Sequence, residues 1–498
     1  MHVFCALLPA LNSPTDTAND PAGAIVPARS LAECAFSRAA GAPLVVGNAL
    51  RLLLDGVENY AAWREAIHSA KQAIYFENYI IRADTTGRSF RDELAARAAA
   101  GVKVRVLLDW LGSCTTPRSF WEPLIGAGGC VSYFNPPRLR GELSWLSRDH
   151  RKSLTVDGRI GFISGVCVSD VWLGDPKRRI EPYRDTGVEL RGPAVADIVR
   201  AFAQIWAQNE EAIPAEELAA LSAPTQEGGI AVRIVATTPN VSALYRLDLL
   251  IASLAQTRLW ITDAYFAGTP SYVHALQSAA RDGVDVRLLV PGGSDLPWLR
   301  PLTTAGYRPL LDAGVRVFEW NGSMLHAKTA VADDRWARVG STNLNMASWL
   351  TNFELDVTVE DEGFAHQMAD LYERDLEHAT EVVLKKRKRV RIPSQKDERA
   401  RSRPARGSLV RATAGALRFT RTVSAAMSGQ RVLDTGDAVT LLIAAAVVLA
   451  FAAFAVFFPR VVAWSAAAVA SVIGLVLLFR ALRTRARRGR KPKTAPPA

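Results

Sequence analysis

A short frame of histidine, lysine and aspartate occurs twice in this chain and constrains its architecture more than any other feature. The frame reads His-x-Lys-x4-Asp, and its two copies consist of His150, Lys152 and Asp157 and of His326, Lys328 and Asp333. The chain has seven histidines in all. Two of them in one frame indicate a duplicated unit rather than two surface histidines that happen to lie near lysines.

The spacing of the two copies supports duplication of the surrounding sequence. The copies are 176 residues apart, and two Gly-Val-x-Val-Arg segments, which begin at Gly101 and Gly283, are 182 residues apart. The apolar pattern predicts strands at 73–81, 102–108 and 258–262 and helices at 195–208, 245–255 and 272–281. Strands that alternate with helices predict an α/β fold with a mainly parallel sheet covered by helices.

The repeated frame suits phosphate chemistry. Alternate side chains of a strand share a face, so His326 and Lys328 are expected about 7 Å apart on one side of the chain. With two copies, one imidazole can attack phosphorus, the other can transfer protons, and the lysines can balance the charge on the phosphoryl oxygens. The sequence shows no metal-ligand spacing such as His-Glu-x-x-His or paired Cys-x-x-Cys, so we expect neither a metal nor another cofactor.

The two frames, with Gly340-Ser341-x-Asn343 after the second, resemble the phospholipase D superfamily and within it most closely bacterial cardiolipin synthases. The resemblance implies two tandem phospholipase D-like α/β domains, residues 41–224 and 225–384, related by a pseudo-twofold duplication with the site between them. It extends from about residue 46 to about residue 377 and is supported by Gly47-Asn48, Leu53-x-Asp55-Gly56, Glu77-Asn78-Tyr79-Ile80, 101–109, Arg184-Asp185-Thr186, Gly192-Pro193-Ala194-Val195, Tyr265-Phe266 and Asn352-Phe353-Glu354.

The resemblance also implies roles for single residues. His150 is taken as the nucleophile and His326 as the general acid and base, although the sequence does not decide their order. Asp185 and Glu354, downstream of the motifs, are expected to accept a hydrogen bond from the motif histidines, with a surface salt bridge as the alternative for each. Asp157 and Asp333 are grouped with the catalytic residues, with a structural role in holding strand and loop as the alternative. The expected supporting residues are Ser341, Asn343 and, more weakly, Glu77.

Two loops depart from the family pattern. Cys167 stands where the family has the asparagine of Gly-Gly-x-Asn, and the family's Asn-Leu-Asp-x-Arg-Ser is replaced by the residues 343–348, Asn-Leu-Asn-Met-Ala-Ser. Both histidines and both lysines are kept. These changes therefore bear on substrate preference and rate rather than on reaction class.

Charge and hydropathy predict a membrane anchor near the C-terminus. The net charge is +11, but residues 1–384 carry −9, which argues against a nucleic-acid groove in the catalytic part. Residues 438–458 and 461–479 contain no charged side chain, and each is long enough to cross a bilayer as a helix. We expect a disordered arm over 1–40, a basic juxtamembrane linker over 385–437, a transmembrane hairpin over 438–479 and a basic cytoplasmic tail over 480–498. The alternatives to the hairpin are a re-entrant pair of helices and a buried pair of soluble helices.

Together these features predict a membrane-anchored phosphatidyltransferase on the cytoplasmic side of the bacterial inner membrane. Its expected partners are phosphatidylglycerol, other anionic phospholipids and the membrane, without nucleic acid. Three alternatives stay open: a hydrolase that makes phosphatidic acid, a phosphodiesterase that acts on nucleic acid, and a non-catalytic lipid-binding scaffold.

Overall fold

The computed structural model describes residues 28–136, 147–175, 177, 180–221, 226–239, 241–293 and 300–383. All of them belong to one compact unit, Met1–Lys386. The expected linker, hairpin and tail over 385–498, and the first 27 residues of the expected arm, lie outside the described residues. Among the described residues, no helix combines the length and the apolar character needed to cross a membrane.

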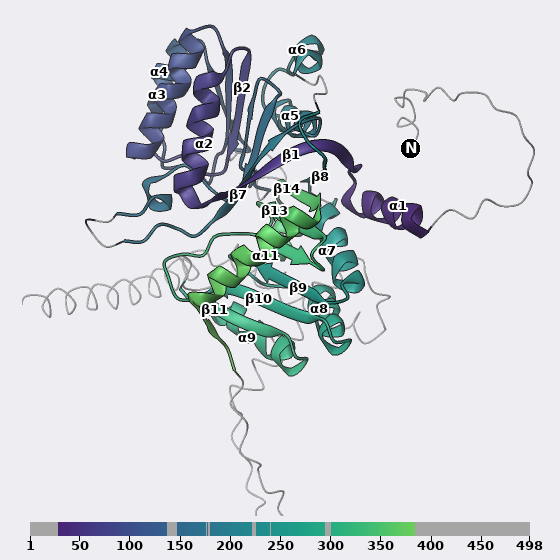
Figure 1. Ribbon diagram of the computed structural model, residues 1–498. Coiled ribbons are helices and arrows are strands. Elements are labelled where there is room, and N and C mark those ends of the chain that lie inside the picture. The colour runs from purple at the N-terminus through teal and green to yellow at the C-terminus, as the bar shows by residue number, and fades with distance from the viewer. Residues whose placement is uncertain are drawn as a thin grey trace, which may run out of the picture. The chain divides into compact units, whose positions relative to one another are not determined.

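Two halves with the same order of elements meet in a single 15-stranded sheet (Figure 1). The strand order is β15-β11-β10-β9-β12-β13-β14-β8-β1-β7-β6-β5-β2-β3-β4, so each half repeats the other outward from the central β8–β1 pair and β15 is an additional edge strand. The first half contains β1 (Val45–Leu54), β2 (Ala73–Asn78), β3 (Lys103–Asp109), β4 (Cys130–Phe134), β5 (Ser153–Val156), β6 (Ile160–Ser164) and β7 (Thr186–Arg191). The second contains β8 (Ile230–Thr237), β9 (Arg258–Thr262), β10 (Asp285–Pro291), β11 (Arg316–Trp320), β12 (Thr329–Ala332), β13 (Trp336–Gly340), β14 (Glu354–Glu360) and β15 (Ala379–Glu381).

The expectation of a mainly parallel sheet is wrong. Within each half only the three outer strands, β2-β3-β4 and β9-β10-β11, pair in parallel, because helices connect them. The motif strands β5 and β12 pair antiparallel with both of their neighbours. Each turns directly into the next strand through a short turn, and such a connection gives an antiparallel pair.

Helices cover both faces of each half. Along β2, Ile74 and Phe76 face one core and Tyr75 faces another, so the whole strand is buried. In the first half α2 (Asp55–Ser69), α3 (Thr85–Ala99), the 3-10 helix η1 (Arg118–Trp121) and α4 (Glu122–Gly126) lie on one side, and Figure 1 shows α2, α3 and α4 there together. The helices α5 (Val195–Trp206) and α6 (Ala215–Ala220) lie on the other side. In the second half α7 (Ala243–Leu254), α8 (Pro270–Arg281), α9 (Arg300–Asp312) and the short α10 (Met346–Leu350) correspond to the first set, and α11 (Glu362–Glu377) packs on the opposite face.

The expected disordered arm is too long. Ala28–Ala40 forms helix α1, which packs against α7 through Phe36 and Ala39. Glu33 of this helix forms an ion pair with Arg233, a buried arginine of β8. The sequence of this helix has only a weak amphipathic pattern, which is why it was not predicted. Its contacts with the second half stabilise it instead.

Candidate active site

The two motif histidines lie where the halves meet, in extended segments that lead into β5 and β12. The backbone N–H of His150 donates to the carbonyl of Phe353, at 2.9 Å, and that of His326 donates to the carbonyl of Arg184, at 2.7 Å. Each motif is therefore hydrogen-bonded to a segment of the other half. The regular strands begin only after the motif lysines, at Ser153 and Thr329, rather than at the histidines as the sequence suggested.

Each histidine is paired with a carboxylate of the opposite half. His150 Nδ1 lies 2.9 Å from Glu354 Oε2, and His326 Nδ1 lies 2.7 Å from Asp185 Oδ2. The two acids are those expected, but the pairing crosses between the halves. A carboxylate on Nδ1 fixes the ring so that Nε2 is available for phosphorus or for a proton.

Both motif lysines are almost completely buried beside these histidines. Lys152 Nζ lies 5.2 Å from the ring centre of Tyr79, which also stands edge-on to His150 at 4.9 Å between ring centres. In the other half Lys328 Nζ lies 5.9 Å from the ring centre of Tyr265 and 2.9 Å from His326 Nδ1. Two buried ammonium groups next to two imidazoles make a site suited to a phosphoryl anion.

Burial controls the charges of these groups. It lowers the pKa of His150, and with the nearby Lys328 it lowers the pKa of His326 to about 4. Burial also lowers the pKa of Lys328 to about 8. Burial alone would raise the pKa of Asp185, but the contact with His326 and the charge of Lys328 hold it at about 2. The site therefore combines ionised acids with a neutral His150, the form of imidazole that can attack phosphorus, while the Asp185 carboxylate favours proton uptake by His326 against the effect of burial.

Further side chains hold the two acids in place. The Ser341 hydroxyl donates to Glu354 Oε2 at 2.6 Å and accepts from the backbone N–H of Leu355 at 3.0 Å. On the other side, Trp172 Nε1 donates to Asp185 Oδ2 at 3.1 Å, and its ring stands edge-on to His326. Trp172 ends the 3-10 helix η3 (Asp170–Trp172). Sequence reasoning missed it, because a single tryptophan in an irregular segment carries no signal.

Comparisons with known proteins agree with this geometry. Residues 250–376 match the family model described as cardiolipin synthase, PLD-like domain. Cardiolipin synthase A of Pseudomonas aeruginosa strain LESB58 is 34% identical over 364 residues, which cover 72% of this chain and 73% of that protein. This chain belongs to the phospholipase D superfamily. Within it, it is a cardiolipin synthase-like phosphatidyltransferase, as the sequence resemblance predicted.

Two further proteins extend the comparison. The cardiolipin synthase of Alkalihalophilus pseudofirmus is 31% identical over 344 residues, which cover 68% of this chain and 68% of that protein. Among solved structures, phosphatidylserine synthase of Haemophilus influenzae Rd KW20 superposes with a TM-score of 0.54 at 16% identity, covering 70% of this chain and 92% of that one. At this identity the second comparison supports the phospholipase D-like fold alone.

In this phospholipase D-superfamily chain the motif aspartates are not brought to the histidines. Asp157 follows β5 and accepts hydrogen bonds from the backbone N–H groups of Lys71, Gln72 and Ala73, at 2.7–2.9 Å, which fixes the turn before β2. Asp333 makes the same contacts at the start of β9, with backbone N–H distances of 2.8–3.0 Å. Both have left-handed backbone, with φ of 53° and 49°. These contacts favour the structural alternative for both aspartates over the grouping with the catalytic residues.

The remaining predicted residues lie under or beside the site. Glu77 is fully buried in β2, accepts a hydrogen bond from Ser153 at 2.9 Å and lies 4.0 Å from Arg151, so it supports the motif strand rather than a histidine. Asn343 is buried in the loop after β13. Cys167 occupies the corresponding loop of the first half; burial raises the pKa of its thiol, and the nearby charge of Lys152 acts in the opposite direction.

Proposed function

We propose that this chain is a membrane-anchored phosphatidyltransferase that converts two molecules of phosphatidylglycerol into cardiolipin and glycerol, without a cofactor. Phosphatidylglycerol is the donor and a second phosphatidylglycerol is the acceptor. The crossed histidine–acid pairs are the observation that carries the proposal. They supply two imidazoles of fixed orientation, one from each half, beside two buried lysines.

In the first step His150 Nε2 attacks the phosphorus of the donor. A phosphorus–nitrogen bond forms and the bond from phosphorus to the headgroup glycerol oxygen breaks. His326 enters this step in its protonated form, which the adjacent Asp185 carboxylate stabilises, and gives its proton to that oxygen. Glycerol leaves and the phosphatidyl group stays on His150. Lys152 and Lys328 offset the charge that develops on the phosphoryl oxygens.

In the second step the acceptor takes the place of glycerol. Neutral His326 removes the proton of the terminal glycerol hydroxyl of the second lipid, whose oxygen attacks phosphorus. The phosphorus–nitrogen bond breaks, which returns His150 to its neutral form and releases cardiolipin. His326 is again protonated and ready for the next donor, so the two steps balance in atoms and protons.

A lipid substrate requires the site to work at a bilayer. The acidic charge of residues 1–384 and the basic residues that follow them support a cytoplasmic catalytic part tethered to the inner membrane through the 438–479 hairpin. The basic stretches on either side of the hairpin then lie at the anionic lipid surface. A tether of this kind keeps the site close to its substrate.

Purified full-length protein in detergent micelles with phosphatidylglycerol as the sole lipid tests this proposal. Cardiolipin and free glycerol in equal amounts are the expected products by thin-layer chromatography and glycerol assay. His150→Ala is expected to abolish both products together with acid-labile labelling of the protein by a phosphorus-labelled lipid. Phosphatidic acid as the main product would replace the transferase with a hydrolase, and an active His150→Ala protein would overturn the mechanism.

A further inference from the structure

We propose that Arg184 is a positioning residue that sets the geometry of the His326–Asp185 pair by clamping the two halves together. The inference rests on the proposed function, because Arg184 acts through the general acid and base. Its side chain donates to Asp375, Asp55 and Thr186 rather than to the His326 imidazole. Its effect is on where His326 stands and how readily that imidazole holds a proton.

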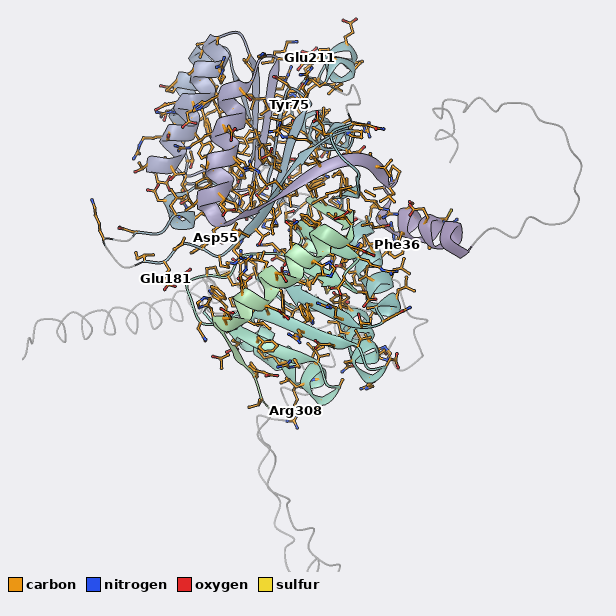
Figure 2. All side chains as sticks on the ribbon, viewed as in Figure 1. Phe36, Asp55, Tyr75, Glu181, Glu211 and Arg308 are labelled. Atoms are coloured by element: carbon orange, nitrogen blue, oxygen red, sulfur yellow. The ribbon has the colours of Figure 1, made fainter. Side chains whose placement is uncertain are left out.

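The Arg184 guanidinium joins elements from both halves. It donates to both carboxylate oxygens of Asp375 in α11, from Nε at 2.8 Å and from Nη2 at 2.9 Å. Its Nη1 donates to Asp55 Oδ1 at the start of α2, at 3.2 Å. Figure 2 shows Asp55 in the region between the halves. The paired geometry with Asp375 is the planar fork that only arginine provides, so the side chain holds α11 in a fixed orientation.

The backbone of the same residue holds the histidine. The Arg184 carbonyl accepts the hydrogen bond of His326 N–H, and its own N–H donates to the carbonyl of Met324 at 2.9 Å. The next residue, Asp185, donates its N–H to Asp55 Oδ1 at 2.9 Å. The backbone that carries Asp185 is thus fixed on both sides, by the Arg184 clamp and by the Asp55 carboxylate that the clamp also binds.

The two histidines differ in the residue that accepts their backbone N–H. In the other half the residue that accepts the His150 N–H is Phe353, an apolar side chain that stacks edge-on against Phe134. Beside the His150–Glu354 pair a different arginine, Arg151, donates to the Glu354 carbonyl at 3.2 Å, so the two crossed pairs are held by different residues. Removing the clamp should affect the proton transfers of His326 and leave attack by His150 in place.

The variants that test this remove or weaken the fork. Arg184→Met keeps an unbranched apolar stem and removes the guanidinium, Arg184→Lys keeps the charge and removes the fork, and Asp375→Asn weakens the partner on α11. Arg233→Met is the matched control, because Arg233 is also buried and also pairs with two carboxylates, Glu33 and Glu360. All are made in the full-length chain and assayed with phosphatidylglycerol.

We expect Arg184→Met to lower kcat on the order of 100-fold with KM changed less than about threefold, because a small misplacement of a catalytic group has an effect of this size. Arg184→Lys should remain at least about tenfold low, since an ammonium cannot replace the fork. Asp185 favours protonated His326, so a loosened pair should shift the alkaline limb of the kcat–pH profile to lower pH. Asp375→Asn should shift it in the same direction, and the Arg184→Met/Asp375→Asn double variant should be no worse than Arg184→Met.

The outcomes separate the inference from the function on which it rests. A wild-type protein that makes no cardiolipin, or a His326→Ala protein that keeps its activity, would overturn both. Suppose that wild type makes cardiolipin and His326→Ala does not. If Arg184→Met then keeps the wild-type pH profile and loses only as much stability as Arg233→Met, the clamp is structural and the inference fails. Should Arg184→Met not fold, an unshifted profile in Asp375→Asn is the result that overturns it.

Discussion

At the scale of single residues, the charge of Glu354 is expected to matter more than its shape. Glu354→Gln keeps the size of the side chain, but the amide no longer stabilises the positive charge that His150 acquires when it bonds to phosphorus. We expect kcat to fall on the order of 100-fold. Single-turnover formation of the phosphohistidine measures this step. Glu360→Gln, at the other end of β14, is the control, and a normal rate in Glu354→Gln would contradict the role of the crossed pair.

The chemistry-bearing residues were the part of the site that sequence predicted best. Histidine, lysine and the downstream acids carry a fixed order along the chain, so His326 and Asp185 can be found without coordinates. Their crossed pairing could not be, because sequence order says nothing of which half each acid faces. Trp172 and Arg184 were not assigned roles for a related reason: Trp172 meets His326, and Arg184 meets Asp375, across segments that are distant in the chain.

At the scale of elements, the motif aspartates are expected to control folding rather than turnover. Each accepts three backbone N–H groups at the start of a parallel strand, so Asp157→Ala and Asp333→Ala should each lower the free energy of unfolding by about 1–3 kcal/mol. Asparagine tolerates the left-handed backbone and retains an acceptor, so Asp157→Asn should lose less. Denaturant melts measure these losses, and kcat per folded molecule should stay within about threefold of wild type.

Two further results would decide between the roles of these aspartates. Lys152→Ala is the contrasting variant, because it should abolish turnover while the fold persists. A fully folded Asp157→Ala protein without activity would restore the aspartate to the catalytic group. The same scale shows where pattern reading failed. The second motif was expected on a strand, but the antiparallel pairing of β5 and β12 depends on turn length and not on the alternation of side chains.

At the scale of the whole molecule, the duplication was predictable and the way the copies join was not. Matching motif and strand spacings predicted two similar halves. Nothing in those spacings indicated that β1 and β8 would pair and make one sheet of the two. The β1–β8 pair joins the two halves in one sheet. The crossed pairs also make each half depend on the other, because neither histidine has its acid within its own half.

Stability against pH is a property of the whole molecule to which three buried carboxyl groups of the second half contribute. Burial raises the pKa of Asp248 to about 6 and the pKa values of Asp263 and Asp356 to about 7. The ordinary value in an unfolded chain is about 3.9, so the folded state binds more protons between these limits. These groups therefore stabilise the fold at low pH, and their contribution is lost as pH rises through about 7. His326 acts in the opposite direction below pH 6.5, because its folded pKa is lowered.

Asp356→Asn should remove one of these contributions. The unfolded carboxyl ionises above about pH 3.9, whereas the folded one keeps its proton up to about pH 7, so the wild type should lose stability relative to the amide variant over this range. Between pH 5 and pH 8 the difference in free energy of unfolding should change by about 2 kcal/mol in favour of the variant. Arg338 and Thr342 stabilise the carboxylate and so already limit the rise of this pKa. Denaturation of the full-length protein, followed by tryptophan fluorescence at both pH values, measures the difference. Asp282→Asn, at an exposed position, is the control. An equal loss of stability at pH 5 and pH 8 would show that Asp356 is needed as an ionised partner of Arg338.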